Sequence, residues 1–191
     1  MKYNVNKLVK LALLSALSIL LMMVIRFPII PSAPFLEYEP GDVPALIGAF
    51  LYGPGAGLLI TAVVSLIQAT TVSAGSGWIG AIMHMVATGT MVLVAGLIYK
   101  RMHSFKGAVI ALLAGSVGMT LVMIPLNLFF TTRFLGVPVE AVKAMIVPII
   151  IPFNLIKAVG NSALTVLVYK SVARVLRIET AASAGEAHET E

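Results

Sequence analysis

Cysteine is absent from this sequence, and charged residues are scarce. Without cysteine, the chain can form neither disulfides nor thiolate metal sites. Charged residues make up 11% of the chain, whereas a soluble domain has about a quarter. Hydrophobic residues make up 59%, and the mean hydropathy is +1.02. These values indicate an integral membrane protein.

Motifs of common enzymes are also absent. The sequence has no Gly-Lys-Ser/Thr, no His-Glu-x-x-His and no Gly-x-Ser-x-Gly, so it predicts no P-loop and none of these hydrolase sites. Its acidic residues fall in loops or near the C-terminus, which leaves no acidic partner for a lysine inside the membrane. We therefore expect no enzyme, no metal and no cofactor.

The apolar runs predict six transmembrane helices in an all-α membrane fold. The expected helices cover about residues 11–25, 43–52, 55–70, 79–99, 107–130 and 144–169. The run over 43–52 is shorter than a normal span. Prolines in residues 26–42 predict a loop. We expect one membrane domain over residues 1–177, followed by a disordered acidic tail over 178–191.

Basic residues predict the orientation of these helices. The side that holds both termini carries Lys2, Lys7, Lys10, Lys100, Arg101, Lys106, Lys170, Arg174 and Arg177. The opposite side carries only Arg26, Arg133 and Lys143. The positive-inside rule therefore places both termini in the cytoplasm and the acidic first loop outside. Since the basic residues form no cluster on a soluble domain, the net charge of +5 does not indicate nucleic-acid binding.

One lysine lies deep in the last apolar run. Asn154, Lys157 and Asn161 are spaced i, i+3 and i+7, so they share one face of a helix. A lysine at this depth costs about 3 kcal/mol on insertion scales. Snorkelling to the interface is the alternative, but Lys157 is about a dozen residues from either end of the run. With Asn127 at a comparable depth, this face predicts a polar ligand site open to the outside.

Two further residues have two interpretations each. His84 could line a cavity or bond to a neighbouring helix, and the second is the commoner situation. Trp78, the only tryptophan, fits an interfacial anchor or an aromatic wall for a ligand.

Three stretches together resemble a known family. They are Phe35-Leu36 followed by Gly41-Asp42-Val43-Pro44-Ala45-Leu46, then Gly53-Pro54-x-Ala56-Gly57, and finally Ile151-Pro152-Phe153-Asn154-Leu155-Ile156-Lys157. The chain from about Lys7 to Arg177 resembles the riboflavin-specific substrate-binding subunits, or S components, of bacterial energy-coupling factor (ECF) transporters.

The resemblance implies how such a protein works. It implies a six-helix vitamin-binding protein of the bacterial plasma membrane that mediates riboflavin uptake with a transmembrane coupling subunit and two cytoplasmic ATPases. Ala12 and Ala16 match the small-residue motif that docks on the coupling subunit in this family, and small residues at this spacing let helices approach closely.

The resemblance also implies a flavin site. Asn127, Asn154 and Lys157 match its asparagine and lysine positions. First-loop residues implied in the pocket are Leu36, Glu37, Tyr38 and Asp42. Asp42 has a second interpretation, as the cap of the helix that follows it.

Other functions stay open at this point. The same scaffold could bind another vitamin, such as thiamine or biotin. An autonomous secondary permease is the alternative from a different class, and it would need an intramembrane acid that the sequence does not provide.

Overall fold

The computed structural model describes residues 5–71 and 75–188. Lys2, counted above for the orientation, and residues 189–191 of the predicted tail lie outside the described residues. The helical elements are α1 (Val5–Val24), α2 (Asp42–Tyr52), α3 (Pro54–Thr70), α4 (Gly77–Arg101), α5 (Phe105–Leu126), the π-helix η1 (Asn127–Thr131), α6 (Thr132–Leu135), α7 (Val139–Met145), the π-helix η2 (Ile146–Ile150) and α8 (Ile151–His188).

Four helical stretches are long and apolar enough to cross a membrane. They are Val5–Val24, Gly77–Arg101, Phe105–Leu135 and Val139–Tyr169. α2 and α3 are also apolar but contain 11 and 17 residues, fewer than the roughly 20 that a transmembrane helix needs. These six segments match the six helices predicted from the apolar runs, and the all-α fold is confirmed.

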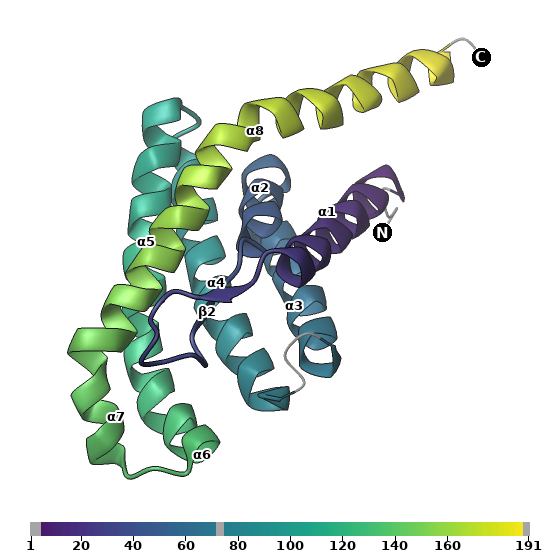
Figure 1. Ribbon diagram of the computed structural model, residues 1–191. Helices are drawn as coiled ribbons and strands as arrows, with labels where there is room; N and C mark the ends of the chain where they lie inside the picture. Colours follow the sequence, from purple (N-terminus) through teal and green to yellow (C-terminus); the bar gives the residue numbers. More distant parts are fainter. Residues whose placement is uncertain (1–4, 72–74, 189–191) are drawn as a thin grey trace.

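The helices form a bundle in which sequence neighbours pack side by side (Figure 1). α3 packs on α2 and α4, α4 on α5, and α8 on α5 and α2, while α1 contacts α2 and α3. Glycines permit the closest approaches. A Cβ at Gly57 would lie 2.8 Å from the carbonyl oxygen of Ala45, and one at Gly115 would lie 2.8 Å from that of Met91. Side chains at these two positions would therefore push α3 from α2 and α5 from α4.

The first loop crosses one face of the bundle and carries a short antiparallel hairpin (Figure 1). β1 (Phe27–Pro28) pairs with β2 (Glu37–Tyr38), with Phe27 opposite Tyr38 and Pro28 opposite Glu37. The loop connects α1 to α2, and its acidic residue Glu39 is buried against the helices.

The fifth and sixth predicted helices are each interrupted by a π-helical turn. Asn127 begins η1, and its amide donates to the carbonyl of Met123 at 2.7 Å. η2 contains Pro148, and the amide of Asn154 just beyond it donates to the carbonyl of Ile150 at 2.8 Å. Proline lacks an N–H, and a side-chain amide that occupies a backbone carbonyl competes with the helical hydrogen bonds. Such turns are frequent at functional sites.

α8 continues to His188, which differs from the disordered tail predicted from residue 178. The stretch contains several alanines, the best helix formers, and it extends an existing helix without a new nucleation step. The division of the chain at residue 177 stays a prediction.

Candidate functional site

Two adjoining cavities lie around Lys157. The loop cavity, about 150 Å³, is lined by first-loop residues, by α3 and α4, by η1 and α6, and by Lys157 of α8. The helix cavity, about 110 Å³, lies between α3, α4, α5 and α8. Gln68, Met83 and Lys157 line both, so the two cavities meet at these side chains.

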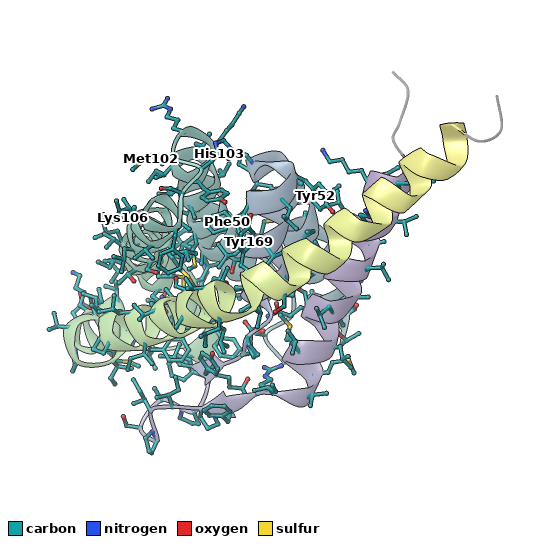
Figure 2. The ribbon with its side chains drawn as sticks, turned by 90° about the horizontal axis from the view of Figure 1, so that it is seen from above. Phe50, Tyr52, Met102, His103, Lys106 and Tyr169 are labelled. Atoms are coloured by element: carbon teal, nitrogen blue, oxygen red, sulfur yellow. The ribbon has the colours of Figure 1, made fainter. Side chains whose placement is uncertain are left out.

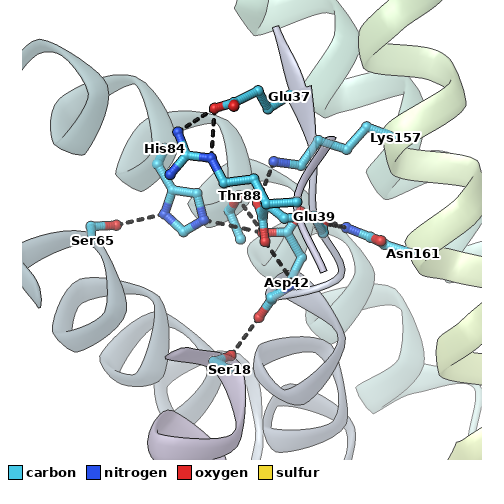
Figure 3. Close-up of polar contacts among 11 residues, drawn as sticks. Ser18, Glu37, Glu39, Asp42, Ser65, His84, Thr88, Lys157 and Asn161 are labelled. Atoms are coloured by element: carbon cyan, nitrogen blue, oxygen red, sulfur yellow. Dashed lines mark hydrogen bonds and ion pairs between the residues drawn. The ribbon is translucent and has the colours of Figure 1, made fainter. Parts of the chain in front are cut away.

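Lys157 has an acidic partner, contrary to the expectation from the sequence. Its ammonium donates to Glu39 Oε1 at 2.5 Å, and both side chains are buried (Figure 3). Glu39 Oε2 accepts a hydrogen bond from the backbone N–H of Gly41 at 2.7 Å. Glu39 belongs to the first loop, so an acid outside the predicted helices reaches a lysine within one. Lys157 therefore does not snorkel, and its ion pair offsets part of the cost of burial.

Asp42 is fully buried behind this pair and joins three helices. Its Oδ1 accepts from Thr88 Oγ1 at 2.9 Å and lies 3.2 Å from His84 Nε2, while its Oδ2 accepts from Asn161 Nδ2 at 2.9 Å (Figure 3). Asn161 Nδ2 also lies 3.1 Å from the carbonyl oxygen of Glu39, to which it donates. Gly41 is the N-cap residue of α2 and Asp42 is the first residue of the helix, and the Asp42 carboxylate bonds to α4 and α8, which differs from the cap interpretation. Its carboxylate fixes α2 to α4 and α8.

His84 bonds to a neighbouring helix and also borders a cavity, so both of its interpretations describe it. Its Nδ1 lies 2.8 Å from Ser65 Oγ on α3, and its Nε2 faces Asp42. His84 also borders the helix cavity. Glu39, Asp42 and His84 bring possible metal-ligand atoms within 4.8 Å of one another. Because their polar atoms already bond to protein groups and Lys157 supplies the cation, we assign no metal here.

Tyr38 packs on the outside of the bundle core. Its ring lies 5.5 Å from that of Phe27, and a Cβ at Gly160 of α8 would lie 3.3 Å from its ring. Burial, followed by the charges of Glu39 and Asp42, raises the pKa of Tyr38 above its usual value. The phenol is therefore neutral at physiological pH and serves as a packing group between the first loop and α8.

The two predicted asparagines are buried, and their polar atoms are used differently. Asn127 donates to Met123 O and accepts from Thr131 Oγ1 at 2.7 Å, which fixes its amide. Asn154 donates to Ile150 O, but its Oδ1 has no hydrogen-bond partner among the described residues. A buried acceptor without a partner costs about 1–3 kcal/mol. Asn154 lines the helix cavity beside Lys157, so this acceptor is available to a ligand.

The structure brings most of the predicted binding residues together. Leu36, Glu37, Asn127 and Lys157 line the loop cavity, and Asn154 lines the helix cavity with Lys157. Tyr38 and Asp42 line neither cavity, and both instead hold the first loop and α2 in place.

The family profile described as "ECF transporter, substrate-specific component" matches residues 6–169. The chain belongs to this family. This S component is 31% identical over 174 residues to the protein named "Riboflavin transporter FmnP" of Bacillus subtilis (strain 168), which covers 87% of this chain and 91% of that protein. It is 32% identical over 178 residues to "Riboflavin transporter RibU" of Staphylococcus aureus (strain TCH60), which covers 90% and 93%.

Solved structures have the same fold as this S component. One, described as "Structure and mechanism of the S component of a bacterial ECF transporter", superposes with a TM-score of 0.78 at 32% identity and covers 91% of this chain and 99% of that chain. Another, an S component for biotin from an ECF-type ABC transporter, gives 0.58 at 17% identity and covers 89% and 95%, which shows a shared fold alone. The S component is therefore a multi-pass membrane transport component and not an enzyme.

Glu39 is the site residue of this S component that sequence reasoning missed. Hydropathy places it in a loop, and loops are normally exposed. One signal could have found it: a buried lysine requires a counter-charge, and the acidic residues nearest the predicted outer end of the bundle are those of the first loop. Asn161 was placed on the correct helix face, but its bonds to Asp42 and Glu39 were not predicted.

Proposed function

We propose that this S component binds riboflavin with high affinity at the outer face of the bacterial plasma membrane. It then hands the vitamin to an ECF module made of a coupling subunit and two cytoplasmic ATPases. The names of the two relatives above support riboflavin as substrate. The distribution of lysine and arginine supports cytoplasmic termini and an outward-facing first loop.

The unpartnered acceptor of Asn154 carries the proposal. The pyrimidine edge of a flavin alternates carbonyl acceptors with an imide N–H donor. Asn154 Oδ1 can accept from that N–H, and the Lys157 ammonium beside it can donate to a ring carbonyl. Asn127 retains one amide hydrogen and one lone pair after its two protein bonds, so it can serve the same edge from the loop cavity.

The cavity walls suit the rest of the molecule. Met119, Met123 and Phe153 give the helix cavity apolar surface for a ring system, and Leu36 gives the same to the loop cavity. Glu37 lines the loop cavity, where a carboxylate can accept hydrogen bonds from ribityl hydroxyls.

Binding requires movement of the first loop. Each cavity is smaller than the roughly 300–1,000 Å³ of a typical ligand site, and first-loop residues close the loop cavity beside Asn127 and Lys157. The loop is held by the bond of Lys157 to Glu39, by that of Asn161 to the Glu39 carbonyl, and by that of Ser18 to the Gly41 carbonyl. The loop can open for the vitamin when these bonds and the packing of Leu36 and Tyr38 on α8 are released, and it can close again when they re-form.

α1 offers a surface for the coupling subunit. Ala12 and Ala16 are exposed on α1, on the side away from its buried residues Leu11, Leu14 and Ser15. A helix of the coupling subunit can approach closely over these two alanines. We propose this face as the docking site.

Titration of flavin fluorescence with the detergent-purified protein tests the substrate. We expect saturable quenching with one riboflavin per chain and no competition from thiamine or biotin. Quenching that biotin or thiamine prevents would assign the site to that vitamin, and no quenching at all would refute flavin binding. Either result would leave the S-component fold intact.

A further inference from the structure

Two other cavities lie where the basic ends of the helices gather, away from the flavin site. The aromatic cavity, about 140 Å³, lies between α2, α4, α5 and α8. The basic cavity, about 590 Å³, lies around the α2–α3 turn and the end of α4. Phe50 and Tyr99 line both, so the two cavities adjoin. None of the described residues of these cavities belongs to the candidate flavin site.

The aromatic cavity has an ordered apolar wall. Phe50 stacks on Tyr99 with ring centroids 4.2 Å apart, and Tyr169 meets Phe50 edge-on at 5.8 Å. The hydroxyls of Tyr99 and Tyr169 lie 3.2 Å apart and bond to each other, so they do not need a ligand. Phe105, which is exposed, completes the lining from α5. Figure 2 shows Phe50 and Tyr169 in the middle of this end of the molecule.

The basic cavity supplies positive charge beside that wall. Lys7 of α1, Lys100 of α4 and His103 just after α4 line it, together with Tyr52. No acidic residue is among the described residues that line either cavity. Lys7 and Lys100 lie close to the ends of their helices, which is the level of the membrane–water interface. A cationic cavity that shares Phe50 and Tyr99 with an apolar one fits a ligand with an anionic head and an apolar chain.

We propose that these cavities together bind one anionic phospholipid of the cytoplasmic leaflet. Its phosphate contacts Lys7 and Lys100, with His103 as a further donor, and an acyl chain enters the aromatic cavity past Phe50 and Tyr99. Basic pockets between transmembrane helices on the cytoplasmic side are typical sites for anionic headgroups. The lipid would connect α1, which carries the proposed docking face, to α4 and α8. This inference does not depend on the identity of the vitamin.

Native mass spectrometry of the purified full chain tests the proposal. Phosphatidylglycerol and phosphatidylcholine with the same acyl chains are titrated separately. We expect one phosphatidylglycerol to bind saturably and more tightly than phosphatidylcholine. Lys7→Gln with Lys100→Gln should weaken phosphatidylglycerol binding by roughly 25-fold, since each cation near the surface contributes about fivefold.

A matched control variant distinguishes binding at these cavities from general attraction by surface charge. Arg101→Gln with Lys106→Gln removes the same charge from nearby side chains that line neither cavity, and it should weaken phosphatidylglycerol binding much less than the first double variant does. Equal weakening in the two double variants would show general electrostatic attraction and overturn the proposal. Equal binding of the two lipids would also overturn it. Glycerol 3-phosphate, which has no acyl chain, should not displace phosphatidylglycerol. Displacement at equal concentration would show that the acyl chain contributes nothing to binding and would overturn the proposal. Unchanged helical circular dichroism checks the fold of every variant.

Discussion

Loss of the Lys157 ammonium should destabilise the protein more than loss of the Glu39 charge. Lys157→Met leaves Glu39 and Asp42 as two buried carboxylates with no ammonium beside them. Glu39→Gln leaves Lys157 with Asp42, which is close enough to attract it. Removing one partner of a buried ion pair costs about 3–5 kcal/mol, and we expect Lys157→Met to fall in this range. For Glu39→Gln we expect about 1–3 kcal/mol, the cost of a buried group that loses its hydrogen-bond partner.

A double-mutant cycle measures the pair itself. The two single variants and Glu39→Gln/Lys157→Met are unfolded reversibly in mixed micelles, and the free energy of unfolding is compared with that of the parent. Because the double variant leaves neither the Glu39 carboxylate nor the Lys157 ammonium without its partner, its loss should be smaller than the sum of the single losses by about 2 kcal/mol or more. Additive losses, within about 0.5 kcal/mol, would refute the role assigned to this ion pair.

The first loop offers a matched control pair. Arg26 and Glu37 also form an ion pair, but their side chains are 25% and 31% exposed. Partly exposed pairs contribute about 0–1 kcal/mol. The same cycle with Arg26→Gln and Glu37→Gln should therefore give a coupling energy below about 1 kcal/mol. If the two pairs gave equal coupling energies, burial would not be the cause of the effect at Lys157.

Three further predictions concern the vitamin and the first loop. Asn154→Leu removes the unpartnered acceptor and should weaken riboflavin binding about 10- to 100-fold in the fluorescence titration; unchanged affinity would remove Asn154 from the site. Gly160→Val places methyl groups against the Tyr38 ring and should loosen the first loop from α8. Stopped-flow fluorescence should then show faster riboflavin release, with a smaller effect for Gly160→Ala. An unchanged release rate would show that the loop does not cover the vitamin. The raised pKa of Tyr38 means that the unfolded chain loses this proton first. Because of Tyr38, the free energy of unfolding should fall as the pH rises above its usual pKa of 10.0. Tyr38→Phe should reduce this fall when unfolding is measured at several alkaline pH values.

The helices could be predicted because long apolar runs leave few alternatives in a bilayer. The backbone must satisfy its hydrogen bonds internally, so each run from residue 43 onward becomes a helix whose ends fall near its glycines, prolines and charges. The same periodicity placed Asn154, Lys157 and Asn161 on one face. The π-helical turns at Asn127 and before Asn154 were not predicted, since they depend on a local competition for single carbonyl groups.

The first loop was the part of the site that sequence reasoning described least well. Hydropathy separates helix from loop, but it does not show whether a loop folds back into the bundle. Glu39 was therefore left unpaired and Asp42 was considered a helix cap. Both are instead buried by contacts with residues over 40 positions away in the chain, such as Thr88 and Asn161. Such contacts are set by tertiary packing and have no local pattern.

The ion pair also affects which vitamin the site favours. An unpaired Lys157 would attract a carboxylate such as that of biotin. In the structure the ammonium already bonds to Glu39, and Asp42 lies close by. A carboxylate ligand would thus bring a third acid to a buried cluster with one ammonium, and an uncompensated buried charge is costly. The neutral imide edge of a flavin adds no charge and supplies the N–H that Asn154 Oδ1 lacks. The same contact that holds the first loop therefore favours riboflavin over biotin.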